Sequence, residues 1–274
     1  MQASSNTPTS AAITVAMIGS PVAHTHLPTA FNRWFSGKGL DAIMVPVDLE
    51  AARLADFLNT MRGWKNCRGC VVTAPHKQAV ADHVDDKSDM AQTLGTVNLV
   101  VRNDDGSLSG DNLDGAGFVR ALHAKSFRTS NTDAALFGCG GAGASIALAL
   151  AEAGASRLQL VDKELDRASL LASKLEQYSG LSVEVGTPES LAGFELVINA
   201  TAVGLDGQSR VFPTDTFNPD STIADVLATS MPTPWLSDAS ARGCKIQTGA
   251  DMAEGQFELI ADRFGWAGEL QTRP

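Results

Sequence analysis

A glycine-rich turn near the middle of the chain constrains its fold most strongly. The apolar run Ala134–Phe137 leads directly into Gly138-Cys-Gly-Gly-Ala-Gly143, and an alanine-rich apolar stretch follows. In a strand–turn–helix unit of this spacing, the first glycine allows a tight turn and the second lets backbone N–H groups approach a pyrophosphate. The third lets the helix lie close to the strand, and the helix N-terminus adds partial positive charge. The turn therefore predicts a dinucleotide site formed by Gly138, Gly140, Gly141, Ala142 and Gly143.

An acidic residue after the next apolar run supports the same prediction. Leu158–Val161 has the composition of a buried strand, and Asp162 follows it directly. A carboxylate at the end of the second strand accepts hydrogen bonds from an adenosine ribose. Asp162 is therefore expected to bind the ribose, with Lys163 beside it.

Composition and charge narrow the class of protein. Of 274 residues, 44% are hydrophobic and 19% charged, as in ordinary soluble globular proteins. A formal charge of −10 disfavours a nucleic-acid or anionic-membrane surface, and no apolar run approaches the roughly 20 residues that span a bilayer. Residues 1–11 lack the basic start and apolar core of a signal peptide. We therefore expect a cytoplasmic protein, either monomer or homodimer, that binds a small molecule and neither nucleic acid nor a membrane.

Cysteine spacing offers one other candidate site. Cys67-Arg-Gly-Cys70 has the CxxC spacing of redox and zinc sites, but no second pair or nearby His/Cys cluster completes a zinc tetrahedron. Because Cys70 begins an apolar strand, we expect structural thiols and no metal.

Apolar runs and helical periodicity alternate along the chain, which predicts parallel βαβ units. Strands are expected at 12–18, 42–47, 69–73, 97–101, 107–109, 134–137, 158–161, 182–185, 195–198, 222–226 and 245–247. Helices are expected at 28–35, 49–61, after Pro75, and at 114–124, 142–153, 164–177, 234–241 and 251–263. A polar stretch, 126–133, is a candidate linker.

The expected fold class is α/β. Residues 1–114 are predicted to form an N-terminal α/β substrate-binding and catalytic domain, and residues 115–249 a C-terminal Rossmann-type doubly wound nucleotide-binding domain. The last segment, 250–274, is free to pack back on the first domain.

Two segments in the first half carry side chains suited to proton transfer. Lys77 follows an apolar strand in Val71-Val-Thr-Ala-Pro-His-Lys77, and Asp114 opens a predicted helix in Gly110-Asp-Asn-Leu-Asp114. Taken separately, each has an ordinary explanation: a solvated surface lysine and a helix N-cap.

Taken together, these segments resemble the shikimate dehydrogenase family, which includes quinate and shikimate/quinate dehydrogenases. Five blocks match in order, and they cover nearly the whole chain after residue 12. They are the first loop (Gly19–His24), the lysine segment (Gly69–Lys77), the asparagine turn (Gly95–Asn98), the aspartate motif (Gly110–Phe118) and the strand and loop beside the nicotinamide (Val197–Gly204). Gln256 stands where the family has a substrate-binding glutamine.

The resemblance implies an NAD(P)-dependent alcohol dehydrogenase that reversibly oxidises a ring hydroxyl of shikimate, quinate or a related cyclic hydroxy acid to the ketone. It makes Lys77 and Asp114 the catalytic pair: Lys77 accepts the hydroxyl proton, and Asp114 orients both the lysine and the hydroxyl. The implied substrate contacts are Thr25, Thr73, Asn98 and Gln256. Further implied cofactor contacts, beyond the glycine turn, are Asp162, Lys163, Asn199, Thr201 and Gly249.

Several positions depart from the family pattern. Two serines of the first loop are replaced by Thr25 and Leu27, an asparagine by Val71 and a threonine by Leu113. The position of a tyrosine that the family has after Asp225 falls near Ala228. Each lost hydrogen bond costs about 1–3 kcal/mol where its partner is left unpaired. We therefore expect weak activity on shikimate, or a preference for a related, less polar hydroxy acid.

The cofactor segment departs as well. Family members that prefer NADP carry Asn-Arg-Thr where this chain has Asp162-Lys-Glu164. Carboxylates there repel a 2′-phosphate, so NAD is expected to be preferred, although Lys163 and Arg167 leave NADP open. Two alternatives to a shikimate-type dehydrogenase remain: a cofactor-binding metabolite sensor with little or no turnover, and another two-domain dehydrogenase such as one acting on methylene-folate.

Overall fold

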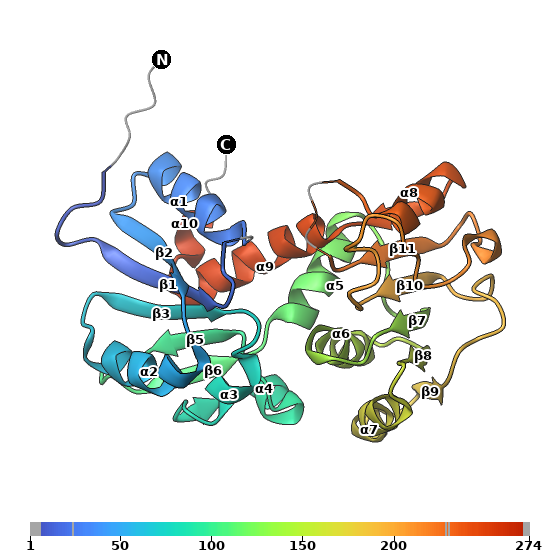
Figure 1. Cartoon of the computed structure of the whole chain (residues 1–274), viewed down its shortest axis with the longest axis horizontal. Helices are drawn as coiled ribbons and strands as arrows, with labels where there is room; N and C mark the ends of the chain where they lie inside the picture. Colours follow the sequence, from blue (N-terminus) through green and yellow to red (C-terminus); the bar gives the residue numbers. More distant parts are fainter. Residues whose placement is uncertain (1–6, 24, 228, 230, 271–274) are drawn as a thin grey trace, which may run out of the picture. The chain divides into compact units, whose positions relative to one another are not determined.

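The structure is a computed structural model that describes residues 7–23, 25–227, 229 and 231–270. The chain divides into two compact units (Figure 1). The first unit comprises residues up to Leu113 together with those from Phe257 onward, and the second comprises Asp114–Gln256. Each unit contains its own six-stranded sheet, so the predicted α/β class is confirmed.

The sheet of the first unit is mixed. Its strand order is β2-β1-β3-β5-β6-β4. The strands are β1 (Ile13–Gly19), β2 (Ala42–Asp48), β3 (Cys67–Val72), β4 (Asp86–Lys87), β5 (Leu99–Arg102) and β6 (Leu108–Asp111). Strand β1 pairs in parallel with β2 and β3, whereas β5 is antiparallel to both β3 and β6.

Helices cover both faces of this sheet, because successive side chains of a strand point to opposite sides. Val15 and Met17 of β1 belong to one apolar cluster, with residues of α1 (Leu27–Lys38) and of α9 (Gly249–Arg263) from Phe257 onward. Ala16 and Ile18 belong to the other, with residues of the remaining helices. These helices are α2 (Leu54–Gly63), α3 (Lys77–Ala81) and α4 (Asp89–Leu94). A short helix, α10 (Ala267–Leu270), follows α9.

The sheet of the second unit is entirely parallel, in the order β12-β11-β10-β7-β8-β9. The strands are β7 (Asp133–Phe137), β8 (Arg157–Val161), β9 (Ser182–Val185), β10 (Leu196–Asn199), β11 (Thr222–Asp225) and β12 (Lys245–Gln247). The strand order reverses between β7 and β10. In doubly wound sheets a ligand binds at that reversal, outside the carboxyl ends of the strands.

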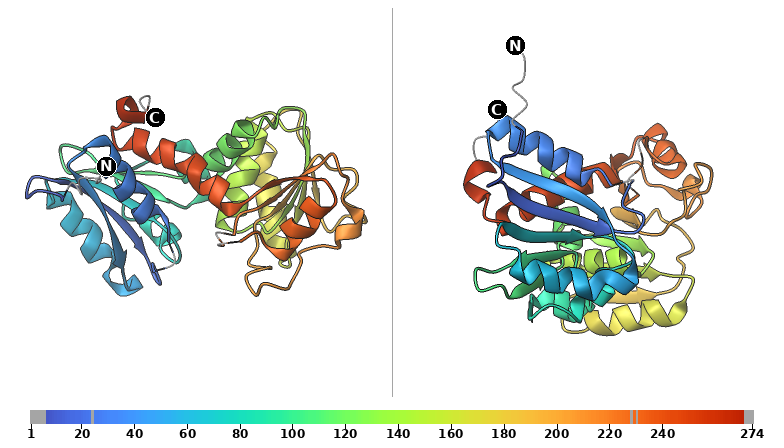
Figure 2. Two further views of the ribbon diagram at one scale, coloured as in Figure 1. Left: turned by 90° about the horizontal axis from the view of Figure 1, so that it is seen from above. Right: turned by 60° about the vertical axis from the view of Figure 1, so that its left-hand side comes forward.

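Four helices accompany this sheet: α5 (Asp114–Ala124), α6 (Gly141–Glu152), α7 (Leu165–Leu175) and α8 (Pro234–Ala241). Trp235 and Leu236 of α8 pack on β7, β10 and β11 in one buried cluster. Figure 2 shows α6 and α8 on opposite faces of the sheet, which is the layering expected of right-handed βαβ crossovers.

A few elements differ from the sequence-based expectation. The predicted helix from residue 49 begins instead with a 3₁₀ turn at Ala51–Arg53. Strand β4 and helices α4 and α10 were not predicted, because each is too short to show periodicity. The segment 126–133 connects α5 to β7 within the second unit. No helix in the described part of the chain is long and apolar enough to cross a membrane.

Candidate functional site

The glycine turn after β7 has the geometry that its spacing predicts. Gly138 has a φ of +95°, and a Cβ there would lie 2.8 Å from the Ala200 carbonyl oxygen. A Cβ on Gly143 would lie 1.8 Å from the Gly138 carbonyl oxygen, so only glycine lets α6 approach the turn this closely. Gly140, the N-cap of α6, has open space beside it. The turn is therefore tight on the protein side and open where a phosphate would bind.

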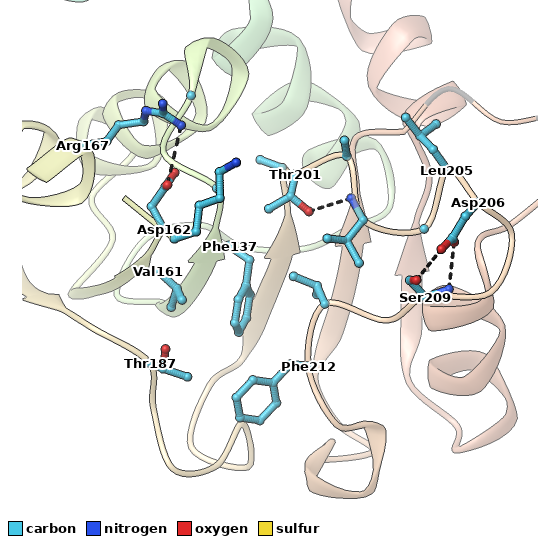
Figure 3. A pocket seen from close by; sticks show the side chains of 18 residues that line it. Phe137, Val161, Asp162, Arg167, Thr187, Thr201, Leu205, Asp206, Ser209 and Phe212 are labelled. Atoms are coloured by element: carbon cyan, nitrogen blue, oxygen red, sulfur yellow. Dashed lines mark hydrogen bonds and ion pairs between the residues drawn. The ribbon is translucent and has the colours of Figure 1, made fainter. Parts of the chain in front are cut away.

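A cavity of about 870 Å³ opens beside this turn, at the carboxyl ends of β7, β8 and β10 (Figure 3). Its volume is in the range of small-molecule and cofactor sites. Five predicted cofactor residues line it: Gly138, Gly140, Asp162, Lys163 and Thr201. The lining also includes residues that the sequence did not single out, among them Phe137, Thr187, Leu205, Asp206, Ser209 and Phe212.

The remaining predicted cofactor residues have other places in the second unit. Gly141 and Ala142 form the first turn of α6, and Gly143 is buried. Gly249 begins α9, and a Cβ there would lie 2.4 Å from the Leu227 carbonyl oxygen. The structure thus gives Gly249 a close backbone contact, which explains the glycine without a ligand.

Asp162 fastens the end of β8 to the glycine turn. Its Oδ2 accepts a hydrogen bond from the Cys139 N–H (2.7 Å), and its Oδ1 accepts one from the Glu164 N–H (2.9 Å). Burial raises the pKa of the Asp162 carboxyl, but these two hydrogen bonds, with Arg167 and Lys163, outweigh it and hold the pKa below its ordinary value. The carboxylate therefore remains charged at neutral pH.

Arg167 on α7 lies next to both acids of this segment. Its guanidinium is 3.6 Å from Asp162 Oδ1 and 2.6 Å from Glu164 Oε2, and Figure 3 shows it above Asp162 at the cavity. Because Lys163 also lines the cavity, the two carboxylates are matched by two cations. The repulsion of a 2′-phosphate that the sequence alone suggested is therefore offset.

The loop after β10 is held from beneath by buried polar groups. Asn199 is fully buried; its Nδ2 donates to the Val203 carbonyl oxygen (2.9 Å) and to Asp225 Oδ2 (3.1 Å). Its Oδ1 accepts from the backbone N–H and the hydroxyl of Thr201. Burial raises the pKa of Asp225, against the hydrogen bonds from Leu227, Asn199 and Thr233 that lower it. Asn199 thus shapes the loop, while Thr201 faces the cavity.

The predicted catalytic lysine and three of the predicted substrate contacts lie in the first unit. Lys77 is the first residue of α3, and Thr73 follows the end of β3. Thr25 precedes α1 and donates its hydroxyl to the Val22 carbonyl oxygen (2.8 Å). Asn98 is buried, and its Oδ1 accepts from the Leu113 N–H (2.8 Å), directly before Asp114.

Asp114 and Gln256 meet in the second unit, although 142 positions separate them in sequence. Asp114 begins α5 and is buried, and Gln256 lies on α9. Gln256 Nε2 donates to Asp114 Oδ1 over 2.7 Å. A side chain assigned to the substrate and a side chain assigned to catalysis are therefore in direct contact.

The apolar departures from the family pattern gather in one place. Val71 and Leu113 are buried in the cluster that joins β1 to α1 and α9, and Leu27 packs against the same cluster. Three positions expected to carry polar side chains thus belong to or pack against a single buried apolar cluster in the first unit. His24 and Ala228, which the sequence comparison also used, lie outside the described residues.

Cys67 and Cys70 are buried free thiols of β3. Burial raises the pKa of both, so neither is a ready thiolate at neutral pH. Within the part of the chain that the structure describes, no three His, Cys, Asp or Glu side chains are grouped to hold a metal ion.

Replacing Asp162 by asparagine tests whether its carboxylate fastens the turn. D162N keeps the size but turns one acceptor oxygen into a donor that faces an N–H, so the free energy of unfolding at neutral pH should fall by about 1–3 kcal/mol. Because the folded-state pKa is lowered, this stabilisation is present above the unfolded-state pKa and is lost as the pH falls through the folded-state pKa.

Urea unfolding of wild type and D162N, at neutral pH and through the acid range, measures this difference. Glu164→Gln, at a side chain that is 54% exposed on the same turn, is the control. Equal stability of D162N and wild type at neutral pH would contradict the role of Asp162.

Comparison with known proteins gives the same family as the sequence blocks. A family model described as the shikimate dehydrogenase substrate binding domain matches residues 17–100. A curated relative named shikimate dehydrogenase (NADP(+)), from Moorella thermoacetica, is 33% identical over 247 residues, covering 87% of this chain and 83% of the relative.

Two solved structures extend the comparison to the whole fold. The ligand-free 5-ketofructose reductase of a Gluconobacter species superposes with a TM-score of 0.85 at 29% identity, covering 93% of each chain. Shikimate 5-dehydrogenase from Thermus thermophilus, in complex with NADP(H) and shikimate, gives a TM-score of 0.83 at 32% identity over 92% of this chain and 93% of that one. The resemblance drawn from the sequence is confirmed: the chain belongs to the shikimate dehydrogenase family, and it is an NAD(P)-dependent oxidoreductase of the alcohol dehydrogenase type.

Proposed function

We propose that this enzyme reversibly oxidises a ring hydroxyl of shikimate, quinate or a related cyclic hydroxy acid to the ketone. The observation that carries the proposal is the Asp114–Gln256 hydrogen bond of 2.7 Å. It joins a carboxylate suited to proton transfer with an amide suited to holding a hydroxyl. Both belong to the unit that contains the glycine turn and its cavity. Family membership supports the same reaction class.

The glycine turn, the cavity and the two cations that line it, Lys163 and Arg167, fit a nicotinamide dinucleotide. The nicotinamide supplies the hydride acceptor when bound. In the oxidation direction, the carbinol C–H bond breaks with its electron pair, and the hydroxyl proton passes to Lys77 Nζ as the C=O bond forms. Asp114 orients the reacting hydroxyl, and Gln256 fixes Asp114 and binds a neighbouring hydroxyl. The reverse direction returns the proton from Lys77 to the ketone oxygen.

Lys77→Ala tests the proton-transfer step. Loss of a positioned general base lowers kcat by roughly 100-fold or more, whereas the affinity for the cofactor, measured by its fluorescence on binding, should not change. The control is Lys65→Ala, at an exposed lysine of the same unit. A kcat of K77A within a few-fold of wild type would contradict the assignment of Lys77 as the proton acceptor. Cofactor binding without turnover of any hydroxy acid by the wild type would favour the metabolite sensor.

We further propose that NADP is the working cofactor. The Moorella relative is named for NADP(+), which opposes the preference for NAD expected from the sequence. The expected preference for NAD rests on repulsion of a 2′-phosphate by Asp162 and Glu164, but Arg167 is within ion-pair distance of both carboxylates. Lys163 and Arg167 are then the groups that would bind a 2′-phosphate.

Arg167→Ala separates the two cofactors. Losing one charge-assisted contact of about 1.5–3 kcal/mol should raise KM for NADP roughly tenfold or more and leave KM for NAD unchanged. Lys174→Ala is the control, because Lys174 lies on the same helix but does not line the cavity. An equal effect on both cofactors, or a wild-type kcat/KM that favours NAD, would contradict this proposal.

A neutral keto sugar is the second candidate substrate. The similar structure from Gluconobacter, which covers 93% of this chain, is named for the reduction of a keto sugar, 5-ketofructose. Leu27, Val71 and Leu113 stand where the resemblance leads us to expect polar side chains, and all three belong to or pack against one apolar cluster. With these polar groups absent, a substrate with fewer charged groups is favoured. Both candidates use the same proton transfer between a hydroxyl and Lys77.

Leu27→Ser distinguishes these substrates. A serine hydroxyl that binds a carboxylate contributes about 1.5–3 kcal/mol, so kcat/KM for shikimate should rise by roughly tenfold. The matched control is Leu40→Ser, at another half-buried leucine of the same cluster. If L27S and L40S leave the activity on shikimate equally unchanged, residue 27 does not select for the carboxylate.

A further inference from the structure

We propose that Ser145 is a positioning residue that sets the place of the Asp114 carboxylate relative to the glycine turn. The inference rests on the proposed function, because it assumes that Asp114 takes part in proton transfer. Ser145 lies on α6, the helix that begins at the glycine turn, and it is fully buried. It does not line the cavity.

The Ser145 hydroxyl binds the backbone of the helix that carries Asp114. Its Oγ accepts a hydrogen bond of 2.7 Å from the Gly115 N–H, and this contact is buried. The Gly115 N–H belongs to the first turn of α5, where N–H groups have no partner within the helix. Ser145 therefore caps α5 from a neighbouring helix, next to the predicted catalytic residue.

Close backbone packing fixes the same turn of α5. A Cβ on Gly115 would lie 2.1 Å from the Ser145 carbonyl oxygen and 2.7 Å from Ala149 Cβ. Any larger residue at this position must push α5 away from α6. The first turn of α5 is thus in direct contact with the backbone of the helix that begins at the cofactor turn.

Two residues further along, α5 is equally close to α9. A Cβ on Gly117 would lie 2.2 Å from Gln256 Cγ, and a Cβ on Gly255 would lie 2.2 Å from the Gly117 carbonyl oxygen. Gln256 in turn donates to Asp114. The Asp114 backbone is therefore set by α6 through Ser145, and its carboxylate by α9 through Gln256.

This packing holds the Asp114 carboxylate and the glycine turn within the same packed unit. Proton transfer depends steeply on position, and a misplacement of about 1 Å costs up to 100-fold in rate. Removal of the Ser145 hydroxyl leaves the Gly115 N–H without this acceptor and frees the first turn of α5 to move. The loss should affect the chemical step and not cofactor binding.

Ser145→Ala is the primary test, with kcat and cofactor affinity measured separately. We expect kcat to fall roughly tenfold, with cofactor affinity within twofold of wild type. Gly115→Ala, which separates α5 from α6, should lower kcat at least as far. Ser221→Ala is the matched control: Ser221 is also buried in the second unit, and its hydroxyl donates to the Phe194 carbonyl oxygen (2.5 Å), away from α5. S221A should lose stability but keep its kcat.

A double-mutant cycle tells positioning from general destabilisation. If Ser145 acts through Asp114, S145A lowers kcat in the wild-type background but not in D114N, whereas an effect on stability alone is the same in both. A tenfold loss in both backgrounds, or a kcat of S145A within twofold of wild type, overturns the proposal.

Hydrogen exchange provides a readout that needs no substrate. The amides of residues 114–117 should exchange at least tenfold faster in S145A than in wild type, with no such change in S221A. Unchanged exchange in S145A overturns the positioning role even if the enzyme is active. Faster exchange, together with full activity of D114N, would instead show that the proposed function of Asp114 has failed.

Discussion

Backbone contact at glycine positions is the constraint on which the second unit depends. Gly143 brings α6 against the carbonyl of Gly138, and Gly115 brings α5 against the carbonyl of Ser145. A side chain at either position would separate elements that now touch. These contacts link the end of β7, the glycine turn with the start of α6, and the start of α5 in a continuous series. Contacts this close fix the position of the glycine turn and of the start of α5 within the folded second unit.

At three positions of the first unit, this chain has apolar side chains where the resemblance to its family leads us to expect polar ones. Val71 and Leu113 are buried among residues of β1, α1 and α9. All three positions belong to or pack against one cluster, so a polar group at any of them would lie among apolar neighbours.

Local patterns were enough to predict most of the fold, and the site only in part. Strands such as β7 and β10 are continuous apolar runs, and the spacing from Gly138 to Gly143 identified the turn. The compensation of Asp162 and Glu164 by Arg167 depends on how α7 is oriented. The burial of Asn199 beneath its loop depends on Asp225, 26 positions away. Contacts between distant residues of this kind leave no periodicity in the sequence.

In the loop after β10, the buried residues that hold the backbone differ in position from the residues that line the cavity. Asn199 and Asp225 fix the course of the backbone from the interior, while Ala200–Leu205 present their surface to the cavity. The side chains of Ala202 and Leu205 line the cavity and cannot hydrogen-bond to this network, whereas Thr201 binds Asn199 and Gly204 has a φ of +106°, so the path of the chain constrains only some of the lining. A loop built in this way lets a lineage acquire new ligand preferences through a few surface substitutions, at little risk to folding.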